Sequence, residues 1–225
     1  TLSRAKSAPG WTSSSSSFKA CNGVGVGGDG MEELTSSRLA QLRWPTDKRL
    51  GEVRDLLASA APVPIRVVHR PGQGDRTAFA LDVAAAALDW FAEYYAIPYP
   101  SDKVDLIAIP DFAFGAMENL GCVTFREVLL IIDPADAAQP ELQRAADVIN
   151  HELAHMWFGD LVTMQWWEGI WLNEAFATFV ETSCSSAYRP DWRVWDTFAR
   201  ARAQAFDVDA RASTRPIEYP VITPE

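Results

Sequence analysis

The spacing of hydrophobic and polar residues changes from a strand-like pattern to a helical pattern at about residue 140. Before this point, short β-branched or apolar runs bounded by turn residues predict four strands, over residues 64–68, 103–110, 122–125 and 128–132. A long alanine-rich segment, residues 75–97, separates the first two runs and predicts a helix that Asp75 opens and that ends before Pro98.

Helical spacing dominates the rest of the chain. Residues 140–158 carry a proline in the expected first turn and apolar residues at helical intervals, and Gly159 is a candidate C-terminal cap. Two further helices are predicted over about residues 172–187 and 192–206. A small mixed sheet followed by packed helices predicts an α+β fold.

The first 50 residues have a different composition from the rest of the chain. Residues 13–17 are all serine, and a glycine-rich stretch and a polar stretch follow. Such segments contain too few apolar residues to form a core. We therefore expect residues 1–50 to be a poorly ordered lead-in and residues 51–225 to contain the folded domain.

Composition and charge narrow the classes of partner. The chain has 225 residues, 48% of them hydrophobic, which is enough for a substantial core. Thirty acidic against twenty basic residues give a formal net charge of -10, which argues against a nucleic-acid partner because phosphate contacts require clustered Lys and Arg. A negative field instead favours cationic ligands, such as the free amino terminus of a peptide.

Cysteine usage and hydropathy bear on the compartment. Cys21, Cys122 and Cys184 are odd in number and widely spaced, so they predict neither a disulfide framework nor a CxxC-type zinc site. No apolar run approaches the length of a membrane-spanning helix, so we expect no membrane segment in this chain. These features favour a reducing, cytoplasmic location; the oligomeric state is left open.

The motif "HELAH" carries the first indication of chemistry. His151 and His155 are four residues apart, so on a helix both imidazoles face the same side and can bind one zinc ion. Glu152 lies beside them, where its carboxylate can reach a water molecule at the metal. Taken alone, the two histidines could also be merely solvated or hydrogen-bonded to neighbours.

A catalytic zinc site requires a third protein ligand, with a fourth position left for water. Glu174 follows His155 after a gap of eighteen residues, which is enough chain for a helix end, a loop and the start of a second helix. A glutamate early in a helix can simply complement the helix dipole. Aromatic and aliphatic neighbours favour a buried Glu174 instead, and a buried charge needs a partner or a metal. Asn173 is a candidate to orient a ligand.

A second cluster, "GAMEN", occupies residues 115–119 and precedes the predicted strand 122–125. Gly115 and Gly121 flank this segment. A glycine-flanked edge strand can bind an extended peptide through its backbone, and the carboxylate of Glu118 can hold a protonated amine. Read alone, the segment could equally be a turn with a surface glutamate. Four tryptophans could line a pocket, but large aromatic residues around a helix pair more often belong to the core. They are Trp157, Trp166, Trp167 and Trp171.

Together, "GAMEN", "HELAH", the eighteen-residue gap and "WLNEAFATF" resemble the zinc aminopeptidases of the alanyl and puromycin-sensitive type, which belong to the gluzincins. The resemblance covers about residues 63–225. It implies a thermolysin-like catalytic domain, here part of a larger multidomain enzyme, that cleaves peptides with a free N-terminus. It also implies one Zn²⁺ ion bound by His151, His155 and Glu174, with Glu152 as the general base.

The resemblance assigns the substrate-binding residues to the "GAMEN" segment. Glu118 would bind the free α-amino group, and Ala116 and Met117 would line the peptide-binding strand between Gly115 and Asn119. Members of this family also carry a tyrosine that stabilises the oxyanion, and the matching segment is expected just past residue 225. Tyr219 lies in a different, proline-rich context and is not assigned this role.

Three other hypotheses about the function remain open from the sequence alone. The chain could bind zinc and yet be inert without the expected tyrosine and flanking domains. An epoxide hydrolase of the leukotriene-processing branch uses the same ligands, but that branch tends to carry glycine at the position of Ala116. The third is a structural α+β protein that binds no metal.

Overall fold

The computed structural model describes residues 12–16 and 62–222. Within them, five strands form one mixed sheet in the order β1-β2-β3-β5-β4. The parallel strands β2, β3 and β5 occupy the centre, and β1 and β4 run antiparallel to their neighbours. The bounds are β1 (Thr12–Ser16), β2 (Ile65–His69), β3 (Val104–Ile109), β4 (Ala116–Met117) and β5 (Cys122–Arg126).

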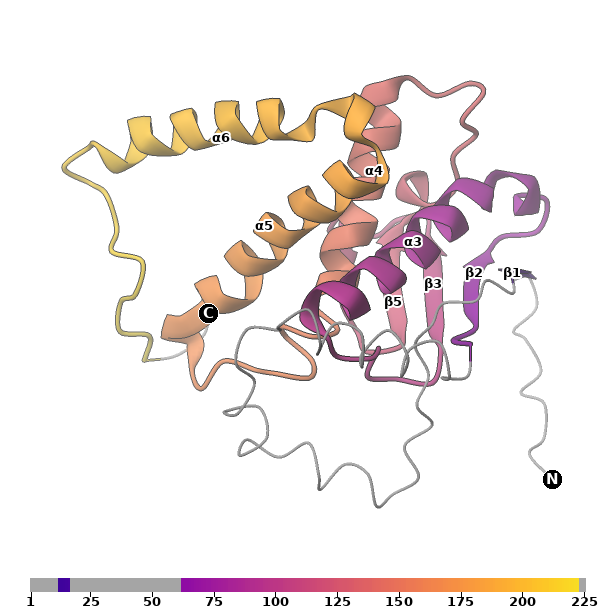
Figure 1. Cartoon of the computed structure of the whole chain (residues 1–225), viewed down its shortest axis with the longest axis horizontal. Helices are drawn as coiled ribbons and strands as arrows, with labels where there is room; N and C mark the ends of the chain where they lie inside the picture. Colours follow the sequence, from indigo (N-terminus) through magenta and orange to yellow (C-terminus); the bar gives the residue numbers. More distant parts are fainter. Residues whose placement is uncertain (1–11, 17–61, 223–225) are drawn as a thin grey trace, which may run out of the picture.

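Buried and half-buried residues alternate along the central strands, so that one face of the sheet packs against the helices. In β3 every second residue is buried and the residues between are half-buried, as expected for a sheet with one face on the core. The register places Leu106 between Val67 and Val123, and all three are fully buried. Helix α3 (Ala78–Tyr95) crosses this face in Figure 1 and packs Leu88 against it.

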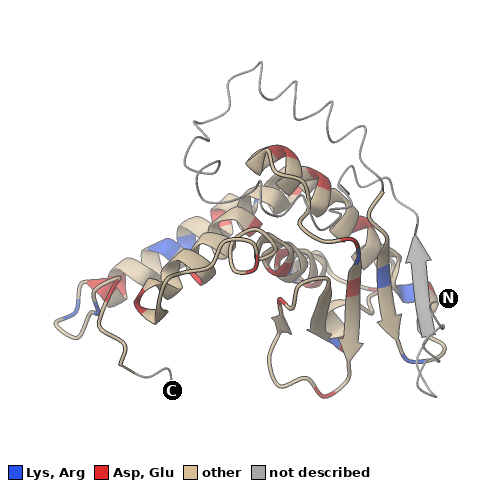
Figure 2. Ribbon diagram, turned by 90° about the horizontal axis from the view of Figure 1, so that it is seen from below, with Lys and Arg blue, Asp and Glu red and all other residues tan. Residues whose placement is uncertain are grey.

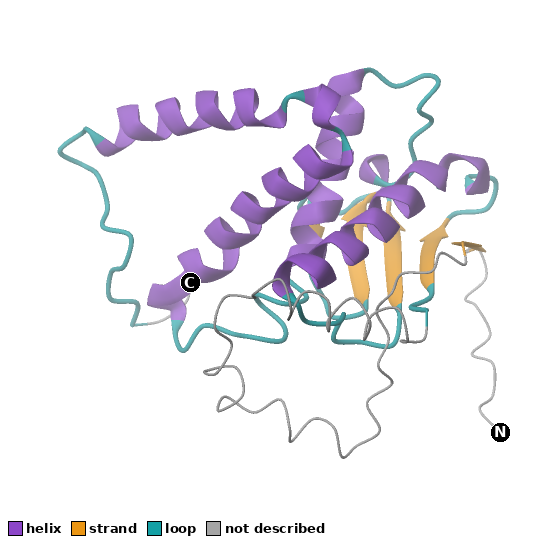
Figure 3. Cartoon of the chain, viewed as in Figure 1, coloured by secondary structure: helices purple, strands orange, loops and turns teal. Residues whose placement is uncertain are grey.

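Three more helices follow the sheet, which confirms the predicted α+β fold. They are α4 (Gln139–Ala154), α5 (Ile170–Tyr188) and α6 (Val194–Asp209). Figure 3 shows the strands on one side of the molecule and α5 and α6 on the other, with α3 and α4 between them. Helix α4 begins where the sequence predicts, and the Glu141 carboxylate accepts a hydrogen bond of 2.8 Å from the Ala138 backbone N–H.

Two predicted elements differ from the structure. The apolar run 128–132 is not a strand: a short 3-10 helix, Glu127–Leu129, starts here, and Leu129 and Leu130 turn into the core. The run is therefore apolar because it is buried and not because it pairs in the sheet. The predicted helix 75–97 begins later, since a separate 3-10 turn, Gly74–Arg76, precedes α3.

An aromatic cluster supports the C-terminal end of α4. The Trp157 ring is 1% exposed and lies 5.6–5.8 Å, centroid to centroid, from Phe91, Tyr95 and Tyr99. Its indole N–H donates a 3.0 Å hydrogen bond to the Ile97 carbonyl. Truncating such a ring typically costs about 3–5 kcal/mol of unfolding free energy. The end of α4 is thus anchored to α3, as core packing of Trp157 predicts.

The C-terminal part of the described chain is less embedded. In α6 only Val194 is buried, and Figure 1 shows this helix extending away from the sheet. The chain then returns to the start of α5. There the Trp166 indole N–H donates a 2.7 Å hydrogen bond to the Val221 carbonyl, and the Trp171 indole N–H donates one of 3.2 Å to the Glu218 carboxylate. None of the described helices combines the length and apolar composition needed to cross a bilayer.

Figure 2 shows acidic and basic residues interspersed along the described helices and strands. Of the predicted lead-in, residues 1–50, the structure describes only Thr12–Ser16, which forms strand β1 beside β2. The remainder of that prediction lies outside the described residues. The division at residue 50 stays a prediction.

Candidate metal centre

Helix α4 presents the two histidines of the "HELAH" motif on one side. The Nε2 atoms of His151 and His155 are 3.1 Å apart. The regular helix ends at Ala154, four residues earlier than predicted, and His155 is its C-cap. The chain then turns through Gly159, whose φ of 142° lies in a region that favours glycine.

Helix α5 brings the third predicted ligand to the same point. Oε2 of Glu174 lies 3.3 Å from Nε2 of His151 and 3.8 Å from Nε2 of His155. Among the described residues, these three side chains form the one group of His, Cys, Asp or Glu arranged to hold a metal ion. The prediction that Glu174 is buried is wrong, because its side chain is 54% exposed: the carboxylate faces the open side of the helix pair.

The other ring nitrogens show which atoms are free to bind a metal. Nδ1 of His151 lies 2.6 Å from Oε2 of Glu181, and Nδ1 of His155 lies 2.8 Å from Oδ1 of Asn173 and 3.0 Å from the Phe158 carbonyl. These oxygens accept hydrogen bonds, so each Nδ1 carries the proton. In the neutral rings both Nε2 lone pairs then face each other and the Glu174 carboxylate.

Three acceptor atoms that converge in this way favour a positive charge between them, either a proton or a metal ion. A tetrahedral zinc centre with bonds of ~2.0–2.1 Å separates its ligand atoms by roughly 3.3 Å, close to the distances found here. The donor set of two imidazoles and one carboxylate also suits catalytic zinc. His151, His155 and Glu174 therefore fit a zinc ion.

The electrostatics of the site indicate the same preference for positive charge. Burial alone would lower the pKa of His151, but hydrogen bonds to Glu174 and Glu181 outweigh it and raise this pKa to about 10. The hydrogen bond from His151, together with the charges of His155 and His151, outweighs burial and holds the pKa of Glu174 below its usual value. Two carboxylates thus favour a positive charge on the imidazole that they flank.

Glu152, the predicted general base, is 6% exposed. Burial raises its pKa to about 8, and the nearby charges of Glu118, Glu174 and Glu181 act in the same direction, opposed by His151. The carboxylate of Glu118 is therefore close enough to the α4 helix to influence Glu152. A cation at the three predicted ligands would lower the pKa of Glu152.

The "GAMEN" segment forms the predicted edge strand. In β4, Ala116 pairs with Phe125 and Met117 with Thr124 of β5, so the other edge of β4 is not paired within the described sheet. Gly115 precedes the strand, and Glu118 and Asn119 follow it. The side chain of Met117 is 45% exposed, while Ala116 packs against the core. The substrate-binding roles of these residues remain predictions.

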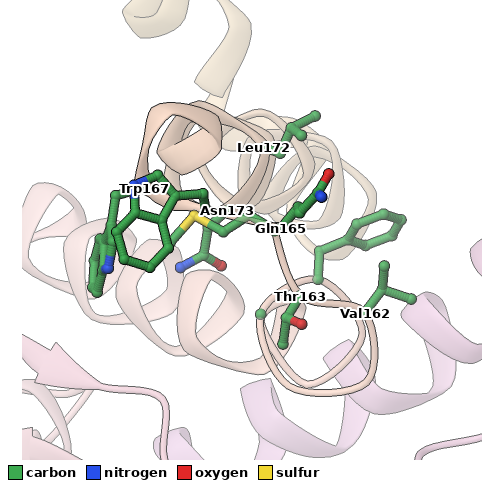
Figure 4. A pocket seen from close by; sticks show the side chains of 10 residues that line it. Val162, Thr163, Gln165, Trp167, Leu172 and Asn173 are labelled. Carbon is green, nitrogen blue, oxygen red and sulfur yellow. The ribbon is translucent and has the colours of Figure 1, made fainter. Parts of the chain in front are cut away.

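The loop between α4 and α5 lines a cavity of about 410 Å³ (Figure 4). Trp167 and Leu172 contribute apolar surface to it, and Asn173 connects it to His155. Trp166 and Trp167 are 46% and 42% exposed, so the prediction that they belong to the core is wrong. Trp166 lies in the loop and Trp167 opens the short 3-10 helix Trp167–Gly169, so neither ring lies on the packed face of a long helix.

Glu181 is a further residue of the site, and it was not predicted from the sequence. The available signal was its position: Glu181 lies seven residues, or two helical turns, after Glu174 and therefore on the same face of α5. The structure supports the suggestion that Asn173 orients a ligand, because it contacts Nδ1 of His155. One helix thus supplies a metal ligand and a partner for each histidine.

A model of the peptidase family M1 domain matches residues 79–225. The chain belongs to peptidase family M1. This result confirms the resemblance to zinc aminopeptidases drawn from the "GAMEN" and "HELAH" motifs, and M1 membership implies zinc at the cluster described above.

Several M1 relatives are similar over most of this chain. Aminopeptidase M1 of Arabidopsis thaliana is 47% identical over 159 residues, which are 71% of this chain and 18% of that protein. The alanine/arginine aminopeptidase of Saccharomyces cerevisiae is 44% identical over 173 residues, 76% of this chain and 20% of the relative. The probable aminopeptidase 2 of Sulfurisphaera tokodaii is 43% identical over 177 residues, which are 78% of this chain and 22% of that protein. The chain spans about a fifth of the length of these M1 relatives.

Proposed function

We propose that this chain carries the zinc centre of an aminopeptidase that hydrolyses the N-terminal peptide bond of peptides. The observation that carries the proposal is the convergence of two Nε2 lone pairs and one carboxylate oxygen, within 3.8 Å of one another, next to an edge strand. The names of the M1 relatives support the same reaction class.

Zinc bound by His151, His155 and Glu174 would act as a Lewis acid that polarises the scissile carbonyl and makes a water molecule more acidic. Glu152 accepts a proton on its carboxylate from the attacking water and returns it to the leaving amine. Its burial at 6% exposure supports this role, because a carboxylate removed from solvent has a pKa closer to neutral pH.

The edge strand would select the substrate. The unpaired side of β4 offers backbone hydrogen bonds to an extended peptide, and Glu118 offers a carboxylate to its α-ammonium group. The contact of β4 with α4 supports this placement, because it brings the strand that precedes Glu118 next to the helix that carries the general base. The first peptide bond would then lie over the metal ligands, which makes the reaction an exopeptidase cleavage.

Metal analysis combined with a fluorogenic aminoacyl-amide assay tests the proposal. We expect one zinc per chain, hydrolysis of the free-amine substrate and no hydrolysis of its N-acetylated form. Glu152→Gln should retain zinc and lose roughly 10²- to 10⁴-fold in turnover, the contribution typical of general acid–base catalysis. Equal cleavage of blocked and free substrates would indicate an endopeptidase. Zinc binding without hydrolysis would favour the alternative, a zinc-binding but inert chain.

A further inference from the structure

The two histidines of the metal centre have chemically different partners. Nδ1 of His155 contacts neutral oxygens, the Asn173 amide and the Phe158 carbonyl. Nδ1 of His151 contacts a carboxylate, that of Glu181, at the shorter distance of 2.6 Å. A neutral amide is therefore sufficient to orient an imidazole in this site, and a carboxylate at residue 181 calls for a further explanation.

Glu181 is held away from solvent. Its side chain and that of His151 are each 19% exposed, and the nearby Asp147 carboxylate already accepts a 2.6 Å hydrogen bond from the Ser185 hydroxyl. Placing a second negative charge beside Asp147 is unfavourable unless a positive charge compensates for it. A positive charge on His151, or on an ion that this ring binds, would provide that compensation, because His151 is the ring that Glu181 contacts.

The charges of the ligands provide that compensation. Two neutral imidazoles and the single carboxylate of Glu174 leave a divalent ion with a net positive charge. A carboxylate bonded to Nδ1 of a ligating histidine makes its Nε2 a stronger donor and brings negative charge close to the ion. Glu181 occupies this position for His151, whereas within residues 12–16 and 62–222 the partners of His155 Nδ1 are the Asn173 amide and the Phe158 carbonyl, both neutral.

We infer that Glu181 is a positioning residue of the metal centre: it fixes the His151 ring with Nε2 toward the ion and adds negative charge that tightens zinc binding. The inference rests on the zinc site of the proposed function. It does not depend on which peptide bond is cleaved or on whether the isolated chain is active.

A purely structural role is the competing explanation, because the Glu181–His151 contact also joins α5 to α4. Ser185 offers a matched control on the same helix, one turn further on. Its hydroxyl bonds Asp147 and Asn150 of α4 and contacts neither histidine. A variant at Ser185 therefore weakens the same helix pair without altering a partner of the metal ligands.

The experiment is a zinc competition titration against a chelator on wild type, Glu181→Gln, Glu181→Ala and Ser185→Ala, with the melting temperature of each metal-free form. We expect zinc affinity to fall about 10-fold in Glu181→Gln, which keeps the shape and loses the charge, and up to about 100-fold in Glu181→Ala. Ser185→Ala should lower the metal-free melting temperature and leave the affinity within about threefold of wild type.

The outcomes distinguish a failure of the role proposed for Glu181 from a failure of the proposed zinc site. Wild-type affinity in Glu181→Gln would overturn the contribution of charge, and this variant has the shape to fold even if Glu181→Ala does not. An affinity loss in Ser185→Ala equal to that in the Glu181 variants would also overturn the inference, because it would reflect helix packing alone. Absence of zinc binding in the wild type would instead overturn the proposed function.

Discussion

The metal centre and the edge strand β4 lie close together but are held in place in different ways. The metal ligands come from two long helices, and each histidine is fixed by a side chain of the facing helix, Glu181 or Asn173. Strand β4 has only two residues, and it pairs with a single neighbour. The ligand geometry is thus determined by the packing of the fold, whereas the position of the strand depends on a few local contacts.

Those local contacts are made by two cationic side chains. Arg126 donates hydrogen bonds to the carbonyls of Phe112 and Ala113, before the strand, and Lys103 donates one of 2.7 Å to the carbonyl of Gly121, after it. The backbone N–H of Arg126 also donates a 2.8 Å bond to the Gly115 carbonyl. Changes on the helices should therefore affect metal binding, and changes at the strand should affect substrate binding alone.

The largest expected effect is the loss of a ligand. Glu174→Ala should weaken zinc binding by more than the roughly 100-fold seen for outer partners of metal ligands. At a zinc concentration of about 1,000 times the wild-type Kd, the wild type should gain about 4 kcal/mol of unfolding free energy, and the variant should gain less than about 1.4 kcal/mol. Chemical denaturation with and without zinc measures both. Equal zinc stabilisation in the two proteins would remove Glu174 from the ligand set.

A smaller effect is expected at the strand. Glu118→Ala should leave zinc affinity unchanged and weaken binding of free-amine ligands by roughly 10- to 100-fold, since a hydrogen bond to a charged group contributes about 1.5–3 kcal/mol. Calorimetric binding of an amino-acid hydroxamate measures this even in a chain without turnover. The N-acetylated hydroxamate serves as the control, and an equal loss for both ligands would contradict an ammonium-binding role.

Arg126→Ala tests whether side chains outside the strand hold it in place. The variant loses two hydrogen bonds to exposed carbonyls, so we expect a loss of about 1 kcal/mol or less in unfolding free energy. Amide hydrogen exchange should accelerate in residues 112–119 and remain unchanged in α4 and α5. Arg126→Lys, which keeps the charge, should be intermediate. Faster exchange in the helices as well would show that the two regions are not independent.

The smallest effect concerns Asp105, which binds Lys103 at 2.7 Å and Arg66 at 2.9 Å. Burial raises its pKa, but these hydrogen bonds outweigh burial and hold it below the usual value. A lowered pKa in the folded state stabilises the fold above the unfolded-state pKa, and this stabilisation is lost as the pH falls through the lowered value. Asp105→Asn should therefore cost about 1 kcal/mol or less at pH 7, because the partners are partly exposed.

The pH series provides the check on this prediction. The difference in unfolding free energy between Asp105→Asn and wild type should shrink as the pH falls through the unfolded-state pKa of about 3.9, and it should vanish once the pH is below the lowered pKa of the folded state, where the carboxyl is protonated in both states. A difference that stays constant across this range would mean that packing, and not charge, explains the cost.

Helical periodicity explains why the metal ligands could be predicted from the sequence. A spacing of four residues places His151 and His155 on one face of any helix, and the gap to Glu174 requires only a second helix beside the first. The edge position of "GAMEN" was also predicted, because the flanking glycines limit the length of the strand.

The features that the sequence did not predict depend on tertiary packing. Glu181 is two turns away from the motif, so its contact with His151 depends on how α5 crosses α4. The run 128–132 has strand-like composition, but its residues are buried by a turn into the core. Trp166 and Trp167 are apolar and yet exposed, because both lie in the connection between α4 and α5, where their rings line a cavity.

The close approach of the backbone at Gly159 has a consequence for mutational tolerance. A Cβ atom at this position would lie 2.7 Å from Oδ1 of Asn173 and 3.2 Å from Nδ1 of His155. Even alanine would push against the pair that orients a zinc ligand. In a saturation scan, residue 159 should therefore be as intolerant as the ligands themselves, although it offers no atom to either metal or peptide.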